Sequence, residues 1–359
     1  MSRERVIVGM SGGVDSAVAA LLLRDAGHDV HGLYMSNWED QDNYCTDAQD
    51  YQDARATARE LGIVLHRVSF AEDYQELVFE EFLAEYRRGR TPNPDVLCNR
   101  EIKFGACLRY AIRLGATRFA TGHYARLNPA AGAGPALLRA RDAAKDQSYF
   151  LCGVERARFS KVSFPLGELP KHQVRARALQ AGLPVHDKPD STGICFIGER
   201  PFAQFLAHYI PETPGPIETL DGRTLGVHRG LPFYTLGQRG GLEIGGVRGE
   251  RAEPWYVARK CLKRNALIVV QEADRQNLAT SALRTGPINW LCEAPITDFE
   301  AGIKVRYRQA DQPARVELLP DHCALIRFQS PQWAVTPGQT AALYQGERCL
   351  GGGVIEETL

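Results

Sequence analysis

The chain has 359 residues, a length that predicts two or three domains. Hydrophobic residues make up 44% of it and charged residues 24%, values typical of a globular protein and not of a disordered one. The formal net charge is zero, so overall charge neither favours nor excludes a nucleic-acid partner. No stretch approaches the roughly 20 apolar residues of a membrane span. A strand-like run from residue 6 leaves no room for a signal peptide, and we expect a cytoplasmic protein.

Short apolar runs alternate with helical patterns through the first two hundred residues. Strands are predicted at residues 6–10, 30–35, 63–68 and 118–121, and helices at residues 15–26, 47–61, 74–88 and 101–114. Alternation of this length predicts an α/β fold with a parallel, doubly wound sheet. Ligands bind such sheets beyond the carboxyl ends of the strands.

The character of the chain changes after about residue 211, where proline and glycine become dense and helical periodicity disappears. Short alternating runs then predict strands of a small barrel or sandwich, at residues 303–308, 314–319, 324–328 and 340–344. We therefore predict three domains: an α/β domain at 1–208, a small central β-rich domain at 209–277, and a C-terminal β-barrel at 278–359.

A glycine-rich loop lies between the first predicted strand and the first helix. Residues 9–16 read Gly-Met-Ser-Gly-Gly-Val-Asp-Ser. Glycines let backbone N–H groups approach an anion, and the helix N-terminus adds partial positive charge. Asp15 could hold a magnesium ion on bound phosphates. A tight turn with serine and aspartate caps is the alternative, but the complete Ser-Gly-Gly-Val-Asp-Ser string after a strand favours phosphate binding. It lacks the ending of a Walker loop.

Nine cysteines are scattered along the chain without any Cys-x-x-Cys pair. This pattern favours free thiols in a reducing compartment and argues against zinc ribbons and thioredoxin-type sites. Cys98 directly precedes the helix predicted at 101–114, where a helix N-terminus would stabilise its thiolate. Cys195 lies between Gly193 and Gly198, which permit close approach of another group. The other cysteines fit small buried hydrophobic residues.

Two basic segments could follow a phosphate backbone. Residues 155–177 carry six positive side chains against two negative ones. In the strand predicted at 303–308, alternation places Lys304, Arg306 and Arg308 on one face. A solvated basic surface is the alternative for both segments.

The motifs together resemble one family. The loop at 9–16 resembles the PP-loop of ATP pyrophosphatases, which split ATP into AMP and pyrophosphate. With it, residues 93–104 and 191–200 resemble the bacterial tRNA-specific 2-thiouridylase family: Asn-Pro-Asp-Val-Leu-Cys-Asn-Arg-Glu-Ile-Lys-Phe and Ser-Thr-Gly-Ile-Cys-Phe-Ile-Gly-Glu-Arg. Further matches follow in the same order at residues 121–126, 145–151, 234–239, 305–308 and 337–339. One departure is Gly240, where the family usually has a larger, often basic residue, and we expect it to affect only a loop contact.

The resemblance implies a fold of the adenine nucleotide alpha-hydrolase-like type and a reaction that consumes ATP with Mg²⁺. The 2-position oxygen of the wobble uridine of tRNA would be adenylated, because AMP makes a poor leaving group into a good one. Cys195 would carry a persulfide and deliver its terminal sulfur. Cys98 would then form a transient disulfide with Cys195, or release hydrosulfide as the nucleophile. Asp95 would act as a general acid or base.

The resemblance also assigns binding residues. ATP would contact Gly9, Met10, Ser11, Gly12, Gly13, Val14, Asp15 and Ser16, with Met35 and Gly122 beside the adenine and ribose. Asn93, Pro94 and Asp95 would lie at the target base, and tRNA would contact His123, Lys145, Asp146, Gln147, Arg306, Tyr307 and Gln339. Taken alone, Met35 fits a core residue, Asp95 a turn residue and His123 a hydrogen-bonded structural histidine.

The resemblance implies tRNAs for lysine, glutamate and glutamine as substrates. It also implies a persulfide donor, either a sulfur-relay protein or a cysteine desulfurase. The protein itself is expected to be a monomer. Two rival functions remain. An amide-forming ATP pyrophosphatase would need no cysteine pair, and a redox-sensitive RNA-binding protein would use a Cys98–Cys195 disulfide only as a switch. Pyrophosphate release that depends on tRNA would argue against the second.

Overall fold

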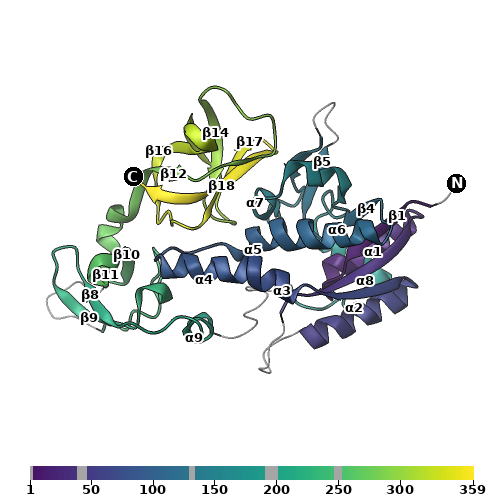
Figure 1. The fold of residues 1–359 in the computed structure, drawn as a ribbon, viewed down its shortest axis with the longest axis horizontal. Coiled ribbons are helices and arrows are strands. Elements are labelled where there is room, and N and C mark those ends of the chain that lie inside the picture. Colours follow the sequence, from purple (N-terminus) through teal and green to yellow (C-terminus); the bar gives the residue numbers. More distant parts are fainter. Residues whose placement is uncertain (1–2, 39–46, 129–133, 191–200, 246–252) are drawn as a thin grey trace.

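A computed structural model describes residues 3–38, 47–128, 134–190, 201–245 and 253–359. Three sheets organise this part of the chain, and Figure 1 shows the parallel sheet with its helices at the right, a barrel at the top and a small sheet at the left. None of the described helices is long and apolar enough to cross a membrane.

The parallel sheet has the strand order β3-β2-β1-β4-β7. Its strands are β1 (Arg5–Gly9), β2 (Asp29–Ser36), β3 (Val64–Ser69), β4 (Arg118–Ala120) and β7 (Val162–Ser163). One face is covered by α1 (Val14–Asp25), α2 (Asp47–Leu61) and α8 (Lys171–Gln180). The other is covered by two helical stretches: α3 (Ala71–Tyr74), η1 (Gln75–Phe79) and α4 (Glu80–Arg87); and α5 (Pro94–Leu97), η2 (Cys98–Cys107) and α6 (Leu108–Arg113).

Side-chain alternation in β1 explains why both faces are covered. Val6 and Val8 belong to the apolar cluster that includes α1 and α8, whereas Ile7 belongs to the cluster on the opposite face. All three side chains are at most 1% exposed. The predicted doubly wound parallel sheet is therefore confirmed.

The helix predicted at residues 101–114 begins earlier than expected. It runs without a break through α5, η2 and α6, from Pro94 to Arg113. Asn93 is the N-cap, and its side-chain oxygen accepts a hydrogen bond from the Val96 amide at 3.4 Å. Proline in the first helical turn has no N–H to leave unpaired, so this sequence begins a helix well. The helix of Cys98 thus begins at Pro94 and not at the predicted residue 101.

The central sheet has the order β10-β11-β8-β9. Its strands are β8 (Gly215–Glu218), β9 (Thr224–His228), β10 (Trp255–Cys261) and β11 (Ala266–Gln271). Every residue of β11 is buried, as expected of the apolar run Ala-Leu-Ile-Val-Val-Gln at the centre of a small sheet. Short helices complete the fold outside the sheets: α7 (Ser148–Leu151), α9 (Phe202–Ala207), η3 (Arg156–Lys161), η4 (Leu231–Phe233), η5 (Leu262–Arg264), η6 (Glu272–Leu278) and η7 (Pro320–His322).

The C-terminal sheet closes into a barrel because β12 pairs with both β16 and β18. Its strands are β12 (Ala279–Thr285), β13 (Asn289–Trp290), β14 (Phe299–Lys304), β15 (Gln312–Leu318), β16 (Ala324–Trp333), β17 (Thr340–Gln345) and β18 (Arg348–Thr358). A hairpin of β5 (Ala125–Asn128) and β6 (Ala136–Arg139) joins it through the pair Arg348↔Leu138. The α/β half of the chain therefore adds two strands to the barrel sheet.

Candidate active site

The phosphate loop lies at the carboxyl end of β1, as predicted. The Ser16 hydroxyl accepts a hydrogen bond from the Ser11 amide at 3.1 Å and donates to the Gly13 carbonyl at 3.0 Å. Gly12 has φ +75°, and a Cβ atom there would lie 2.3 Å from the Asp50 carbonyl oxygen. Only glycine fits this position. The loop is thus a tight turn at a helix N-terminus, a geometry suited to an anion.

Asp15 in the first turn of α1 is held by a lysine from the distant helix α8. Lys171 Nζ lies 2.7 and 2.8 Å from the two carboxylate oxygens of Asp15, and the Tyr124 hydroxyl donates to one of them at 2.8 Å. Burial, reinforced by the charge of Asp15, raises the pKa of Tyr124, so this phenol stays a donor.

A second carboxylate joins the same cluster. Asp190 lies 2.7 Å from Lys145 Nζ, 2.7 Å from Lys171 Nζ and 2.9 Å from an Arg175 nitrogen. Burial opposes its ionisation, but the hydrogen bonds from Lys145 and Lys171 outweigh that effect and lower the pKa of Asp190 to about 2. Three cations, Lys145, Lys171 and Arg175, therefore cluster around Asp15 and Asp190 beside the phosphate loop.

Lys188 ties the phosphate loop to α2. Its Nζ lies 3.1 Å from the Gly12 carbonyl oxygen, 2.7 Å from an Asp50 oxygen and 2.5 Å from an Asp53 oxygen. No sequence motif pointed to a role for Lys171, Lys188 or Asp190. Basic residues counted at 155–177 included Lys171, but nothing in that count indicated that it points at the loop.

Gly122 and Met35, the two residues expected beside the adenine and ribose, lie in different surroundings. A Cβ atom on Gly122 would come within 2.7 Å of the Ser16 nitrogen, so this glycine allows the end of β4 to pack against the start of α1. Met35, in β2, is half-buried, and its sulfur lies 3.3 Å from the sulfur of Cys107. The structure thus brings Gly122 to the phosphate loop and packs Met35 against the helix that carries Cys98.

Cys98 is only 3% exposed and lies in the second turn of its helix. The expectation that it stands at the helix N-terminus is wrong, because the helix begins at Pro94 and the Cys98 amide bonds back to the Pro94 carbonyl. The free N–H groups of the first turn therefore belong to earlier residues. On the same helix, burial and the neighbouring Cys98 raise the pKa of Cys107, which keeps that thiol protonated.

Asp95 lies one turn before Cys98, in α5. Burial raises the pKa of its carboxyl group, and the positive charge of Lys103 opposes the effect. A carboxyl group with a raised pKa is protonated over a wider pH range than an ordinary aspartate, which suits proton transfer.

The helix of Cys98 and the phosphate loop meet through the segment that follows β4. In this segment Gly122 packs on Ser16, while the ring of His123 lies 5.6 Å from the ring of Phe104 in η2. His123 is 8% exposed, and its Nδ1 lies 2.8 Å from the Thr121 hydroxyl. Burial, with a smaller effect of Lys103, lowers its pKa well below the ordinary value. His123 is therefore a buried, neutral histidine.

The basic strand face predicted at 303–308 does not exist. Strand β14 ends at Lys304, and the next residues form a bend and a turn. Lys304 is 9% exposed and lies over the Tyr344 ring, while Arg306 donates to the Ala334 carbonyl at 2.8 Å. Of the three basic residues, only Arg308 is exposed. Side chains alternate between two faces only within a strand, and the predicted strand extended to residue 308 whereas β14 ends at Lys304.

The other residues assigned to tRNA by resemblance mostly hold the protein together. The buried carboxylate of Asp146 accepts from the Ala140 and Ser148 amides, and the Gln147 side chain accepts from the Tyr124 amide. The rings of Tyr307 and Phe150 lie in contact, with their centres 4.4 Å apart and their planes tilted by 42°. Lys145 forms an ion pair with Asp190, and Asn93 and Pro94 begin the helix α5. Gln339 donates hydrogen bonds to the carbonyls of Thr91 and Pro92.

Cys195 and the whole segment 191–200 lie outside the described residues, so its pairing with Cys98 stays a prediction. Within the described part of the chain, no two cysteines form a disulfide with each other. In the same part, no group of three or more His, Cys, Asp or Glu side chains is arranged to hold a metal ion.

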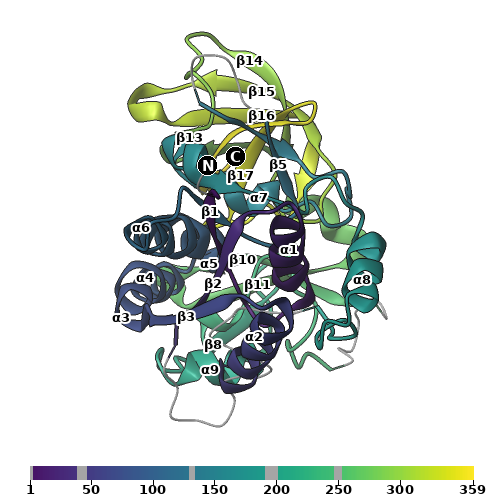
Figure 2. The same cartoon turned by 90° about the vertical axis from the view of Figure 1, so that its right-hand side faces the viewer.

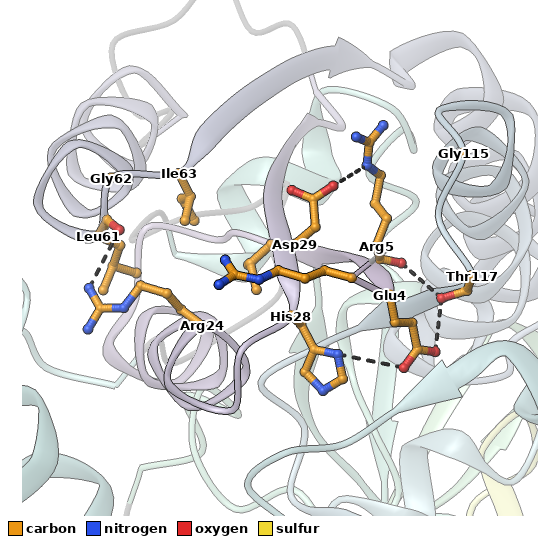
Figure 3. A pocket seen from close by; sticks show the side chains of 12 residues that line it. Glu4, Arg5, Arg24, His28, Asp29, Leu61, Gly62, Ile63, Gly115 and Thr117 are labelled. Atoms are coloured by element: carbon orange, nitrogen blue, oxygen red, sulfur yellow. Dashed lines mark hydrogen bonds and ion pairs between the residues drawn. The ribbon is translucent and has the colours of Figure 1, made fainter. Parts of the chain in front are cut away.

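A cavity of about 900 Å³ lies at the opposite edge of the parallel sheet, at the amino ends of β1 and β2. Figure 3 shows Arg5 paired with Asp29 and His28 with Glu4, while Arg24 donates to the Leu61 carbonyl. Arg5 lies 2.7 Å from Asp29, and Glu4 lies 3.6 Å from His28 and accepts from Thr117 at 2.9 Å. Because ligands of parallel sheets bind at the carboxyl edge, this cavity is not the candidate site.

Comparisons with known proteins assign the chain to a family. Three sequence families match consecutive segments: the tRNA methyl transferase HUP domain at residues 4–199, the tRNA methyl transferase PRC-barrel domain at 203–271 and the aminomethyltransferase beta-barrel domain at 280–355. The tRNA-specific 2-thiouridylase MnmA of Cupriavidus metallidurans is 52% identical over 359 residues, covering 99% of this chain and all of the relative. The chain belongs to the tRNA-specific 2-thiouridylase family.

A second 2-thiouridylase, from Marinobacter nauticus, is 54% identical and covers 99% of this chain and 92% of its own length. Among solved structures, the U34-tRNA thiolase NcsA of Methanococcus maripaludis is 19% identical, with a TM-score of 0.36 over 54% of this chain and 61% of that one. At that TM-score the likeness carries no argument. The family assignment depends on the full-length relatives, and it confirms the resemblance found in the sequence.

Proposed function

We propose that this protein is an ATP-dependent tRNA 2-thiouridylase that converts the wobble uridine of tRNA to 2-thiouridine. The observation that carries the proposal is that the phosphate loop and the helix of Cys98 both pack on the segment that follows β4. The phosphate loop packs on Gly122, and the neighbouring His123 packs on the helix that holds Asp95 and Cys98. The segment 121–123 thus contacts both the phosphate loop and the helix of Cys98, which supports the proposal.

In the first step the uridine 2-oxygen attacks the α-phosphorus of ATP, pyrophosphate leaves, and the base carries AMP. The phosphate loop binds the phosphates through backbone N–H groups, and the cluster of Lys145, Lys171 and Arg175 offsets their negative charge. We propose Asp15 as a magnesium ligand. Its carboxylate is now held by Lys171, which the phosphates would attract in turn.

In the second step the terminal sulfur of a Cys195 persulfide attacks carbon 2, and AMP leaves with the oxygen. The thiolate of Cys98 then attacks the Cys195 sulfur. This breaks the bond between the Cys195 sulfur and the sulfur now attached to carbon 2, so that 2-thiouridine and a Cys98–Cys195 disulfide are formed. A thiol reductant returns both cysteines to thiols, since the disulfide stores two oxidising equivalents. The Asp95 carboxyl would donate or accept the proton at the base.

The remaining assignments are proposals of the same kind. We propose a monomer that acts in the cytoplasm on tRNAs for lysine, glutamate and glutamine, with sulfur from a persulfide donor protein. We also propose domains at 1–208, 209–277 and 278–359, although β5 and β6 of the first domain add strands to the barrel sheet.

Mass spectrometry of tRNA nucleosides tests the proposed function. After incubation of the protein with tRNA, ATP, magnesium and a persulfide source, we expect one 2-thiouridine, one AMP and one pyrophosphate per turnover. Pyrophosphate release should require tRNA, and EDTA should stop it. Thiolation without pyrophosphate release would contradict the adenylation step, and binding of tRNA without any turnover would favour a redox-sensitive RNA-binding protein.

A further inference from the structure

One turn of the barrel is fixed firmly to the last strand. It consists of residues 336–339, here called the barrel turn, between β16 and β17. The Gly338 amide donates to the Ile355 carbonyl at 2.8 Å, and the Ile355 amide donates to the Gln339 carbonyl at 2.7 Å. The Gln339 amide donates to the Thr336 carbonyl at 3.2 Å. The barrel turn therefore moves only as the closed barrel moves.

The barrel turn grips residues 91–93, here called the catalytic loop, from more than two hundred positions away in the sequence. The Gln339 carboxamide nitrogen donates to the Thr91 carbonyl at 2.8 Å and to the Pro92 carbonyl at 3.0 Å. In return, the Thr91 amide donates to the Pro337 carbonyl at 3.0 Å. The Thr91 and Pro92 carbonyls lie directly before Asn93, the N-cap of the Cys98 helix. These hydrogen bonds therefore fix the position at which that helix starts.

Close packing leaves little room for the catalytic loop to shift. Gly338 has φ +93°, and a Cβ atom there would lie 2.9 Å from backbone atoms of Thr91. The central domain adds a further contact, because the hydroxyl groups of Thr91 and Thr235 lie 3.3 Å apart. Arg306 connects the barrel to the residue after Thr235, with its guanidinium 3.5 Å from the Leu236 carbonyl.

The catalytic loop leads directly to the reacting groups. Asn93 caps the helix, Asp95 stands in its first turn and Cys98 in the next. A helix that begins at Asn93 transmits a displacement of the loop to both side chains, because its first turn is fixed by the cap. A shift of about 1 Å is enough to lower a rate roughly a hundredfold.

We infer that Gln339 is a positioning residue: it holds the catalytic loop on the barrel and so sets the positions of Asp95 and Cys98. This inference rests on the proposed function in so far as Asp95 and Cys98 are the reacting groups. The family resemblance expects Gln339 at the tRNA, whereas both hydrogen bonds of its carboxamide nitrogen go to the protein's own backbone.

The test measures thiol alkylation in the free protein, without tRNA or ATP. Peptide mass spectrometry follows the rate at which a maleimide or iodoacetamide labels Cys98, with the fully buried Cys107 of the same helix as an internal reference. In Gln339→Ala, two lost hydrogen bonds should raise the Cys98 labelling rate about tenfold. The Cys107 rate should stay unchanged. Gln339→Glu, which keeps the size but loses the donors, should behave like Gln339→Ala.

The matched control is Gln312→Ala in β15, because that carboxamide donates only to the nearby Ala310 carbonyl. It should leave Cys98 labelling unchanged. In single-turnover thiolation, Gln339→Ala should lower the rate constant about tenfold or more while its tRNA dissociation constant stays within about twofold.

Unchanged Cys98 labelling together with weaker tRNA binding would overturn the inference and make Gln339 an RNA contact. Equal acceleration at Cys98 and Cys107 would also overturn it, because it would mean general loosening of the helix. The labelling result does not depend on turnover. The inference can therefore fail while 2-thiouridine is formed, and it can hold where none is formed.

Discussion

The ammonium group of Lys171 lies between two carboxylates that belong to different parts of the chain. It is 2.7 Å from an Asp15 oxygen and 2.7 Å from an Asp190 oxygen. Its side chain is 12% exposed, so solvent screens the bridge less than it screens a surface pair. Asp15 opens the helix behind the phosphate loop, and Asp190 ends the described segment before residues 191–200. The bridge connects the proposed ATP site to the chain that leads to Cys195.

Asp15→Asn should abolish adenylation. The substitution keeps the size of the side chain but removes the charge that would bind magnesium, and we expect pyrophosphate release to fall about 10²- to 10³-fold. Unfolding temperature and tRNA affinity should change little. Asp25→Asn, on the exposed end of the same helix, is the matched control and should be fully active. Normal pyrophosphate release by Asp15→Asn would remove the assignment of the phosphate loop.

Cys98→Ser and Cys195→Ser should separate the two steps. Either variant should release pyrophosphate with tRNA present, because adenylation needs no thiol, but neither should complete a cycle to 2-thiouridine. Cys195→Ser should also carry no persulfide after incubation with a donor. Cys107→Ser is the control, since burial keeps that thiol protonated and we assign it no chemistry. Full thiolation by Cys98→Ser or Cys195→Ser would exclude the proposed sulfur transfer.

Arg306→Ala should mainly affect protein stability, whereas Arg308→Ala should mainly affect the salt dependence of tRNA binding. Arg306 donates to two backbone carbonyls, so its loss should lower the free energy of unfolding by about 1–2 kcal/mol and leave the salt dependence of tRNA binding unchanged. Arg308 is exposed, and its loss should flatten the log–log salt slope by about one unit if its turn contacts a phosphate. Salt titrations of tRNA binding and urea unfolding measure both. A flattened slope in Arg306→Ala would show that its side chain leaves the carbonyls for the RNA.

Stability should fall as the pH drops below about 6.5, the ordinary pKa of histidine. Burial lowers the pKa values of His66, His123 and His228, so the unfolded chain takes up protons at a higher pH than the folded chain does. Unfolding free energy then decreases with falling pH, by at most about 1.4 kcal/mol per pH unit for each histidine. Urea titrations between pH 5 and 8 measure the slope.

His228→Gln should reduce this pH dependence. The His228 Nε2 lies 2.9 Å from the Asn265 carbonyl oxygen, a bond that glutamine can also donate, and glutamine does not titrate. His172→Gln, at an exposed position in the first turn of α8, is the control and should leave the slope unchanged. If the unfolding free energy were the same at pH 5.5 and 7.5, the lowered pKa values of the three histidines would be contradicted.

Local rules placed most elements of the α/β half. The predicted helix 47–61 coincides with α2, and the phosphate loop stands between β1 and α1 as its glycines and serines indicated. The predicted start of the Cys98 helix was too late, although proline after an asparagine cap is a helix-start signal. The end of β14 was missed because basic and apolar residues continue to alternate after the backbone has turned.

The amino-acid sequence by itself determined the parallel sheet, the phosphate loop and the family, because hydrophobic period, glycine positions and short motifs act over a few neighbouring residues. Only the tertiary structure decided which charges meet. Lys171 reaches Asp15 from 156 positions away, and Gln339 reaches Thr91 from 248. Such pairs depend on the path of the chain between them, and a long side chain can point to solvent, RNA or backbone without any change in the local pattern.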